Sequence, residues 1–170
     1  FPALRSCDLF NLEGGLRPGI AEKAVREIKP VMDARSHVHK RTHNIYFKPD
    51  IPELAPDHPA LRKVETISHT VCADQIPGSV VLAIYEYEPL QRFLAATMGK
   101  TRLHVMQDPL ARTNVMGYRA GEALNWHFDR SEFTTTLLLQ ASERGGDLEY
   151  RTDLRSDDNP NYDGVAKLLE

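Results

Sequence analysis

The chain has 170 residues and a formal net charge of −3, and 41% of its residues are hydrophobic and 26% charged. These values suit one folded domain with a hydrophobic core, and they exclude a collagen-like, disordered or coiled-coil chain. The negative balance provides no positive field that would gather nucleic acid or acidic lipid, so we expect neither as a partner.

Targeting and redox signals are weak. The best apolar run, residues 80–84, is far shorter than the roughly 20 residues that cross a bilayer, and no signal peptide is recognisable. The two cysteines, Cys7 and Cys72, do not make a disulfide framework in a domain of this size. We therefore expect reduced thiols in a cytoplasmic protein without a membrane partner.

The N-terminal part, residues 1–100, is expected to be mainly helical. Pro18 suits the first turn of a helix, and Gly99 suits a helix end. Apolar residues recur at helical spacing in three segments. The predicted helices span residues 18–35, 59–73 and 88–98. A short strand is predicted over residues 43–47.

The second part, residues 101–170, consists of short β-prone runs separated by turn residues. The predicted strands span residues 103–107, 113–118, 124–128, 133–140 and 148–151, and a last helix starts near 164. Strands this close, with no helices between them, indicate an antiparallel sandwich or jelly roll. We therefore expect a single α+β domain over residues 1–170, with a helical N-terminal part and the first strands of a jelly roll.

The segment around His127 and Asp129 carries the chemistry. Residues two apart on a strand point to the same face, so this imidazole and this carboxylate could hold one metal ion. Two histidines and one carboxylate form the facial triad of non-heme iron oxygenases. Asn125 has the same parity and is expected on the same face, whereas Trp126 and Phe128 are expected in the core.

Several spaced elements around this pair resemble the iron(II)/2-oxoglutarate dioxygenase superfamily. They are Tyr118-x-x-Gly121, His127-x-Asp129, the Thr/Leu-rich run that ends at Gln140, and Gly145-Gly146 before Asp-Leu-Glu-Tyr150. The motif Asn125-Trp-His-Phe-Asp129, together with Arg155-Ser-Asp157, most resembles a branch of bacterial hydroxylases and halogenases that act on free amino acids. The resemblance is densest over residues 114–169.

The resemblance implies a double-stranded β-helix (a cupin-like jelly roll) and an enzyme that uses iron(II), 2-oxoglutarate and O2, with ascorbate as a supporting reductant. It implies hydroxylation of an unactivated C–H bond in a small molecule, an amino acid or a derivative. The chlorinases of the branch have a small residue at the carboxylate position, where this chain has Asp129. We therefore expect hydroxylation and not halogenation.

Five residues besides the metal pair are candidates for binding roles. Tyr118 is a candidate for binding the cosubstrate, as the resemblance implies. Asn125 is a candidate for substrate contact, and a hydrogen bond that closes the sheet would explain it equally. Glu122 and Arg130 are candidates for contact with a charged substrate group, although most charges beside a turn are solvated. Arg62, on a predicted helix, is a candidate for substrate binding because the resembling branch binds the amino acid carboxylate with a basic residue from its helical part. His37, His39 and His43 are interpreted as a basic, solvated helix end and not as a metal site.

The resemblance also requires a distal histidine and a later arginine or lysine that binds 2-oxoglutarate. His127 is the last histidine in the sequence, so neither partner is present in this chain. Two explanations remain: the C-terminal strands lie outside this sequence, which we favour, or the site is degenerate. The alternatives in function are an inactive jelly-roll binding protein and a cupin-type metalloenzyme that does not use 2-oxoglutarate.

Overall fold

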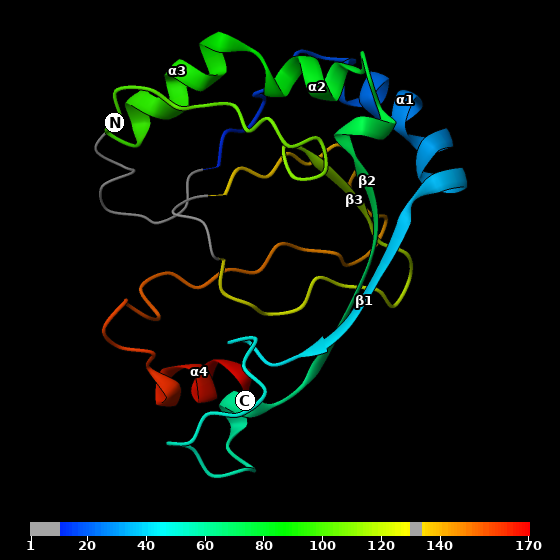
Figure 1. The fold of residues 1–170 in the computed structure, drawn as a ribbon. Coiled ribbons are helices and arrows are strands. Elements are labelled where there is room, and N and C mark those ends of the chain that lie inside the picture. Colours follow the sequence, from blue (N-terminus) through cyan, green and yellow to red (C-terminus); the bar gives the residue numbers. More distant parts are fainter. Residues whose placement is uncertain (1–10, 130–133) are drawn as a thin grey trace. The chain divides into compact units, whose positions relative to one another are not determined.

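A computed structural model describes residues 11–129 and 134–170 and shows a mixed α+β chain (Figure 1). The chain divides into two compact units. The described residues of unit 1 are 11–38, 69–117 and 137–145, and those of unit 2 are 39–68, 118–129, 134–136 and 146–170. The α+β class is as predicted.

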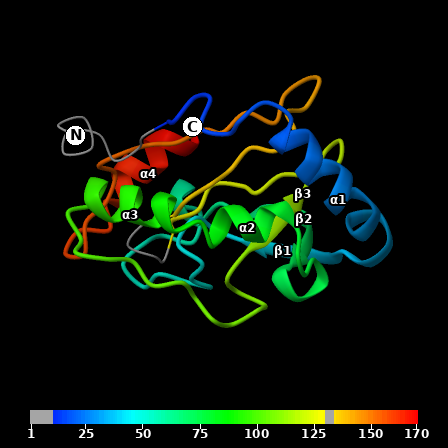
Figure 2. The ribbon, with the colours of Figure 1, turned by 90° about the horizontal axis from the view of Figure 1, so that it is seen from above.

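Unit 1 contains the three longest helical segments of the N-terminal half, together with the short turn η3 (Ala73–Gln75). Helix α1 (Ile20–Arg35) and helix α3 (Glu88–Thr97) confirm two of the predicted helices. Helix α2 (Val80–Tyr85) was not predicted and packs beside α1 (Figure 2). The Glu27 carboxylate on α1 accepts a hydrogen bond of 2.8 Å from the first backbone N–H of α2, which fixes the two helices together.

The predicted helix over residues 59–73 is wrong. Only a single 3-10 turn, η2 (Pro59–Leu61), forms there, and strand β2 (Val64–Cys72) follows it. Six of the nine residues of β2, Val64-Glu-Thr-Ile-Ser-His-Thr-Val-Cys72, are Val, Ile, Thr or Ser. β-Branched side chains favour a pleated strand, and the three-to-four-residue spacing of the aliphatic residues had suggested a helix instead.

The three strands form one small sheet in the order β1-β2-β3. Strand β1 (His37–His43) lies earlier than the strand predicted at 43–47, and β3 (Asn114–Gly117) confirms the one predicted at 113–118. Strands β2 and β3 are antiparallel, with His69 opposite Gly117 and Cys72 opposite Asn114, and they run side by side in Figures 1 and 2. β1 and β2 contribute residues to both units.

Each unit has its own hydrophobic core. In unit 1, Ala24 and Ile28 of α1 pack against Val71 of β2 and against Ile76 and Val81. In unit 2, helix α4 (Tyr162–Leu169) packs against η2 (Figure 1). Its buried face meets residues from several other segments of the unit. The core of unit 2 consists of Ile45, Ala60, Val165 and Leu169, with Tyr46, Leu54, Trp126, Phe128, Leu154 and Leu168 packed around it.

The other strands predicted for the second part do not form in the residues that the structure describes. Residues 103–107, 124–128, 134–140 and 148–151 carry no regular strand, and Phe133 lies outside the described residues. The helix predicted from 164 is confirmed as α4, where the Asn161 side chain accepts from the Gly164 N–H at 3.1 Å. Across the described ranges, no helix is both long and apolar enough to cross a membrane.

Candidate metal site

The segment 123–129 has no regular secondary structure, bends at Trp126 and is hydrogen-bonded to two neighbouring segments of unit 2. The Ile67 N–H of β2 donates to the Ala123 carbonyl at 3.1 Å, and the Phe128 N–H donates to the Ile45 carbonyl at 3.4 Å. Between them the side-chain amide of Asn125 donates to the Glu65 carbonyl. No regular ladder forms over residues 123–129.

The side chains of this segment alternate between two sides, as the sequence predicts. Trp126 and Phe128 pack against the core of unit 2, and the Phe128 ring lies 5.3 Å from the Tyr46 ring between centroids. The His127 side chain is 25% exposed and that of Asp129 52%. The two side chains contact each other, as the sequence predicts, although no strand forms here.

The two nitrogen atoms of His127 have different partners. Nδ1 lies 2.8 Å from the Asn125 carbonyl oxygen, and Nε2 lies 3.1 Å from Oδ1 of Asp129. A carbonyl oxygen only accepts, so Nδ1 carries a hydrogen and donates it. In the neutral ring Nε2 then has a lone pair that faces a carboxylate oxygen. Two acceptors this close need a proton or a cation between them.

This donor set fits a divalent metal ion. Histidine nitrogen and carboxylate oxygen bind such ions at roughly 2.1 Å, and two ligands at right angles would then be about 3.0 Å apart, close to the 3.1 Å found here. Metal-bound histidines commonly donate their other N–H to a backbone carbonyl, as His127 does. Within residues 11–129 and 134–170, no group of three or more His, Cys, Asp or Glu side chains comes together, so the pair has no third ligand there.

An aromatic ring and two cations border the pair. The Phe47 ring lies edge-on to the His127 ring at 6.1 Å, and the Arg41 guanidinium lies 4.8 Å from the Phe47 centroid. Phe47 has a φ of 55°, an unusual backbone conformation for a residue with a side chain. On the other side, the Arg155 guanidinium stacks on the Phe128 ring at 4.2 Å and lies 3.5 Å from the Asp129 carbonyl oxygen.

The other predicted site residues lie in several environments. Partial burial raises the pKa of the Tyr118 phenol, although 44% of this residue is still exposed. The Glu122 carboxylate accepts from the Arg119 N–H at 2.8 Å and so closes the turn that contains Gly121. The Asn125 amide bonds to β2, which is the hydrogen-bonding role considered for it in the sequence analysis. Arg130 lies outside the described residues.

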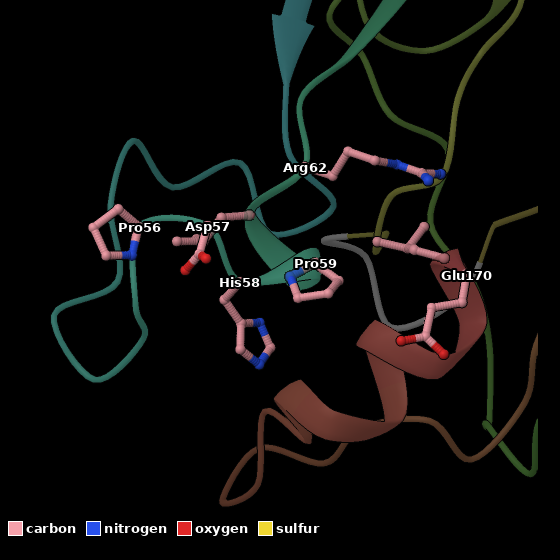
Figure 3. A pocket seen from close by; sticks show the side chains of 8 residues that line it. Pro56, Asp57, His58, Pro59, Arg62 and Glu170 are labelled. Atoms are coloured by element: carbon pink, nitrogen blue, oxygen red, sulfur yellow. The ribbon is translucent and has the colours of Figure 1, made fainter.

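Arg62 lines a separate pocket of unit 2, with a volume of about 430 Å³. Asp57 and His58 line the same pocket, together with Glu170, which follows α4. Figure 3 shows Arg62 extending away from the Asp57 and His58 side chains. Neither His127 nor Asp129 lines this pocket, so the structure does not bring Arg62 together with the candidate metal pair.

Two residues of the site were missed by the sequence analysis. His43 and Thr66 are only 6% and 2% exposed. They are hydrogen-bonded to each other, and Thr66 also accepts from the Asn125 N–H. The His37, His39 and His43 cluster lies on strand β1, so its assignment to a helix end is wrong. His37 and His39 are exposed as expected, whereas His43 is buried. The local signal for a strand over 37–43 was weak, since only Val38 and Thr42 are β-branched there.

Comparison with known proteins gives no relative: no family model, no curated protein and no solved structure matches this chain.

Proposed function

We propose that this chain carries part of the iron(II) centre of a 2-oxoglutarate-dependent oxygenase that hydroxylates a small molecule, an amino acid or a derivative. The observation that supports it is the convergence of His127 Nε2 and Asp129 Oδ1 at 3.1 Å, with Nδ1 already bound to a carbonyl. An imidazole and a carboxylate are two of the three ligands in the facial triad of such enzymes. The third ligand would have to come from outside the described residues.

The roles of the residues follow from their contacts. A bound iron(II) ion would supply the site at which 2-oxoglutarate chelates and oxygen is activated. His127 and Asp129 would hold the ion, and Asn125 would orient the imidazole through its carbonyl group. Asp129 fills the position that is a small residue in the resembling chlorinases, which supports hydroxylation. The Arg155 guanidinium beside Asp129 provides a positive charge that suits an acidic group of the substrate.

We further propose that the segment 123–129 belongs to a jelly roll. Support comes from the hydrogen bonds that Ala123 and Asn125 make to β2. In such a fold the metal ligands lie on one strand face and the apolar residues between them face the core. Trp126 and Phe128 are packed in that way.

Anaerobic titration of the full-length gene product with iron(II) and then 2-oxoglutarate tests the proposal. We expect stoichiometric iron binding, and 2-oxoglutarate binding that requires the iron and gives the visible charge-transfer absorption of the chelate. His127→Ala should abolish both. His39→Ala, which removes an exposed imidazole from β1, is the matched control and should leave both unchanged.

The outcomes separate the alternatives. Binding of neither iron nor 2-oxoglutarate would overturn the proposal and favour an inactive binding protein. Tight metal binding without 2-oxoglutarate would instead favour a cupin-type metalloenzyme. If both bind, succinate release with iron(II), ascorbate and a panel of amino acids identifies the substrate, since turnover of 2-oxoglutarate should rise only with the correct one.

A further inference from the structure

A continuous chain of hydrogen bonds leads from His127 into the interior of unit 2. The Asn125 carbonyl accepts from His127 Nδ1 at 2.8 Å, and the Asn125 N–H donates to Thr66 Oγ1 at 3.2 Å. Thr66 Oγ1 in turn lies 2.8 Å from Nε2 of His43. At the far end, His43 Nδ1 lies 2.9 Å from the Asn44 carbonyl oxygen.

The chemistry of these groups fixes the direction of each hydrogen bond. His43 Nδ1 faces a carbonyl, so it must carry a hydrogen and donate it. Burial of a cation without a carboxylate partner is costly, so the neutral ring is favoured and its Nε2 accepts. The Thr66 hydroxyl therefore donates to His43, and its oxygen is free to accept from Asn125.

This arrangement holds Asn125 at two atoms. Its N–H is bound to the Thr66 hydroxyl and its side-chain amide to the Glu65 carbonyl, both on β2. The remaining Asn125 carbonyl then points at His127 and selects the ring orientation that turns Nε2 toward Asp129. β-Propensity alone would explain a threonine on a strand. It does not require that the hydroxyl be buried with two hydrogen-bond partners, as that of Thr66 is.

We propose that Thr66 and His43 are positioning residues for His127. They fix the Asn125 backbone, and through it they fix the tautomer and orientation of the imidazole that faces Asp129. The effect on metal affinity rests on the proposed function, whereas the effect on the tautomer does not. Outer partners of metal-bound histidines typically change metal affinity by about 10- to 100-fold.

The test compares Thr66→Val, which keeps the side-chain shape and removes the hydroxyl, with Thr66→Ser, which keeps the hydroxyl. Thr70→Val, at a partly buried position on the same strand, is the matched control. Long-range proton–nitrogen NMR on the metal-free protein reports which ring nitrogens of His43 and His127 carry a hydrogen. Titration with Co(II), as a substitute for iron(II), reports the affinity.

We expect Nδ1 of both His43 and His127 to carry a hydrogen in the unaltered protein. Thr66→Val should lower the fraction of His127 rings with a hydrogen on Nδ1 and weaken Co(II) affinity about 10- to 100-fold, and Thr66→Ser should restore both. An Nδ1 without a hydrogen on either ring of the unaltered protein would overturn the proposal without any variant. So would a folded Thr66→Val protein with unchanged tautomer and affinity.

If Thr66→Val changes the tautomer of His127 but the unaltered protein binds no Co(II), the positioning role stands and the proposed metal site is overturned.

Discussion

Nε2 of His127 and Oδ1 of Asp129 lie 3.1 Å apart on a segment that belongs to no regular strand. The pairing arises from the alternation of side chains and from the tether between Nδ1 and the Asn125 carbonyl. Both side chains retain contact with solvent. The pair is therefore accessible to an ion or a small molecule.

Asp129→Asn separates binding from stability. The substitution removes the charge opposite His127, so we expect at least a tenfold loss of affinity for Co(II) or iron(II). Because Asp129 is 52% exposed, the free energy of unfolding should change by less than about 1 kcal/mol. Metal titration and urea denaturation of one protein sample measure the two effects.

Asp147→Asn, at an exposed carboxylate of unit 2, is the control and should change neither quantity. Equal metal affinity of Asp129→Asn and the unaltered protein would show that the carboxylate is not a ligand.

Gly121 and Gly117 should respond differently to alanine. Gly121 has a φ of +83°, and nothing lies near an added Cβ, so Gly121→Ala should cost about 1 kcal/mol from backbone strain alone. At Gly117 an added Cβ would meet the Met32 sulfur at 3.2 Å, at the flexible end of a side chain. Gly117→Ala should therefore shift the unfolding free energy by less than about 0.5 kcal/mol, because lower unfolded-state entropy offsets the contact. Urea denaturation of both variants measures the two losses of unfolding free energy. A larger loss in Gly117→Ala than in Gly121→Ala would contradict the prediction.

Tyr46 should make the protein less stable in alkali. Burial, and secondarily Tyr162, raise the pKa of Tyr46 to about 12, and its hydroxyl donates to the Pro160 carbonyl at 2.6 Å. A group whose folded pKa is raised stabilises the fold fully below its unfolded pKa of about 10, and this stabilisation is lost as the pH rises through the folded value. Tyr46→Phe should lower stability by about 1 kcal/mol at neutral pH.

The measurement is the free energy of unfolding between about pH 8 and 11. We expect it to fall less steeply in Tyr46→Phe than in the unaltered protein above about pH 10. Parallel curves would show that this phenol does not contribute to the alkaline loss.

The core of unit 2 should depend on Val165 of α4. This side chain is fully buried, and Val165→Ala should cost about 2 kcal/mol through lost apolar burial and a residual cavity. Val38, which is 52% exposed on β1, provides the matched Val38→Ala control with a change below about 0.5 kcal/mol. Urea denaturation measures the change in unfolding free energy of both variants. Equal changes would mean that α4 does not pack as described.

The sequence predicted the elements whose signals are local. Helices α1 and α3 have apolar residues at helical spacing, and their bounds agree closely with the prediction. Strand β2 was misassigned because its aliphatic residues happen to repeat at three and four positions. Its density of β-branched residues was the better signal.

The candidate site likewise has a part that could be predicted from the sequence and a part that could not. His127, Asp129 and the alternation with Trp126 and Phe128 follow from side-chain direction within one segment, so they were predictable. His43 and Thr66 reach the site only because β1 and β2 lie beside that segment, a relation between distant parts of the chain. The Asn125 amide bond to Glu65 also replaces a backbone ladder, and no local pattern reports such a substitution.

The alternation of residues 125–129 has a consequence for how this region can change. A single replacement leaves every other side chain on its own side, so its effect is confined to one position: metal binding at His127 or Asp129, packing at Trp126 or Phe128. Insertion or deletion of one residue would instead exchange the two sides. Trp126 and Phe128 would then face solvent, and His127 would enter the core. We expect a change in the length of this stretch to disturb both packing and metal binding at once.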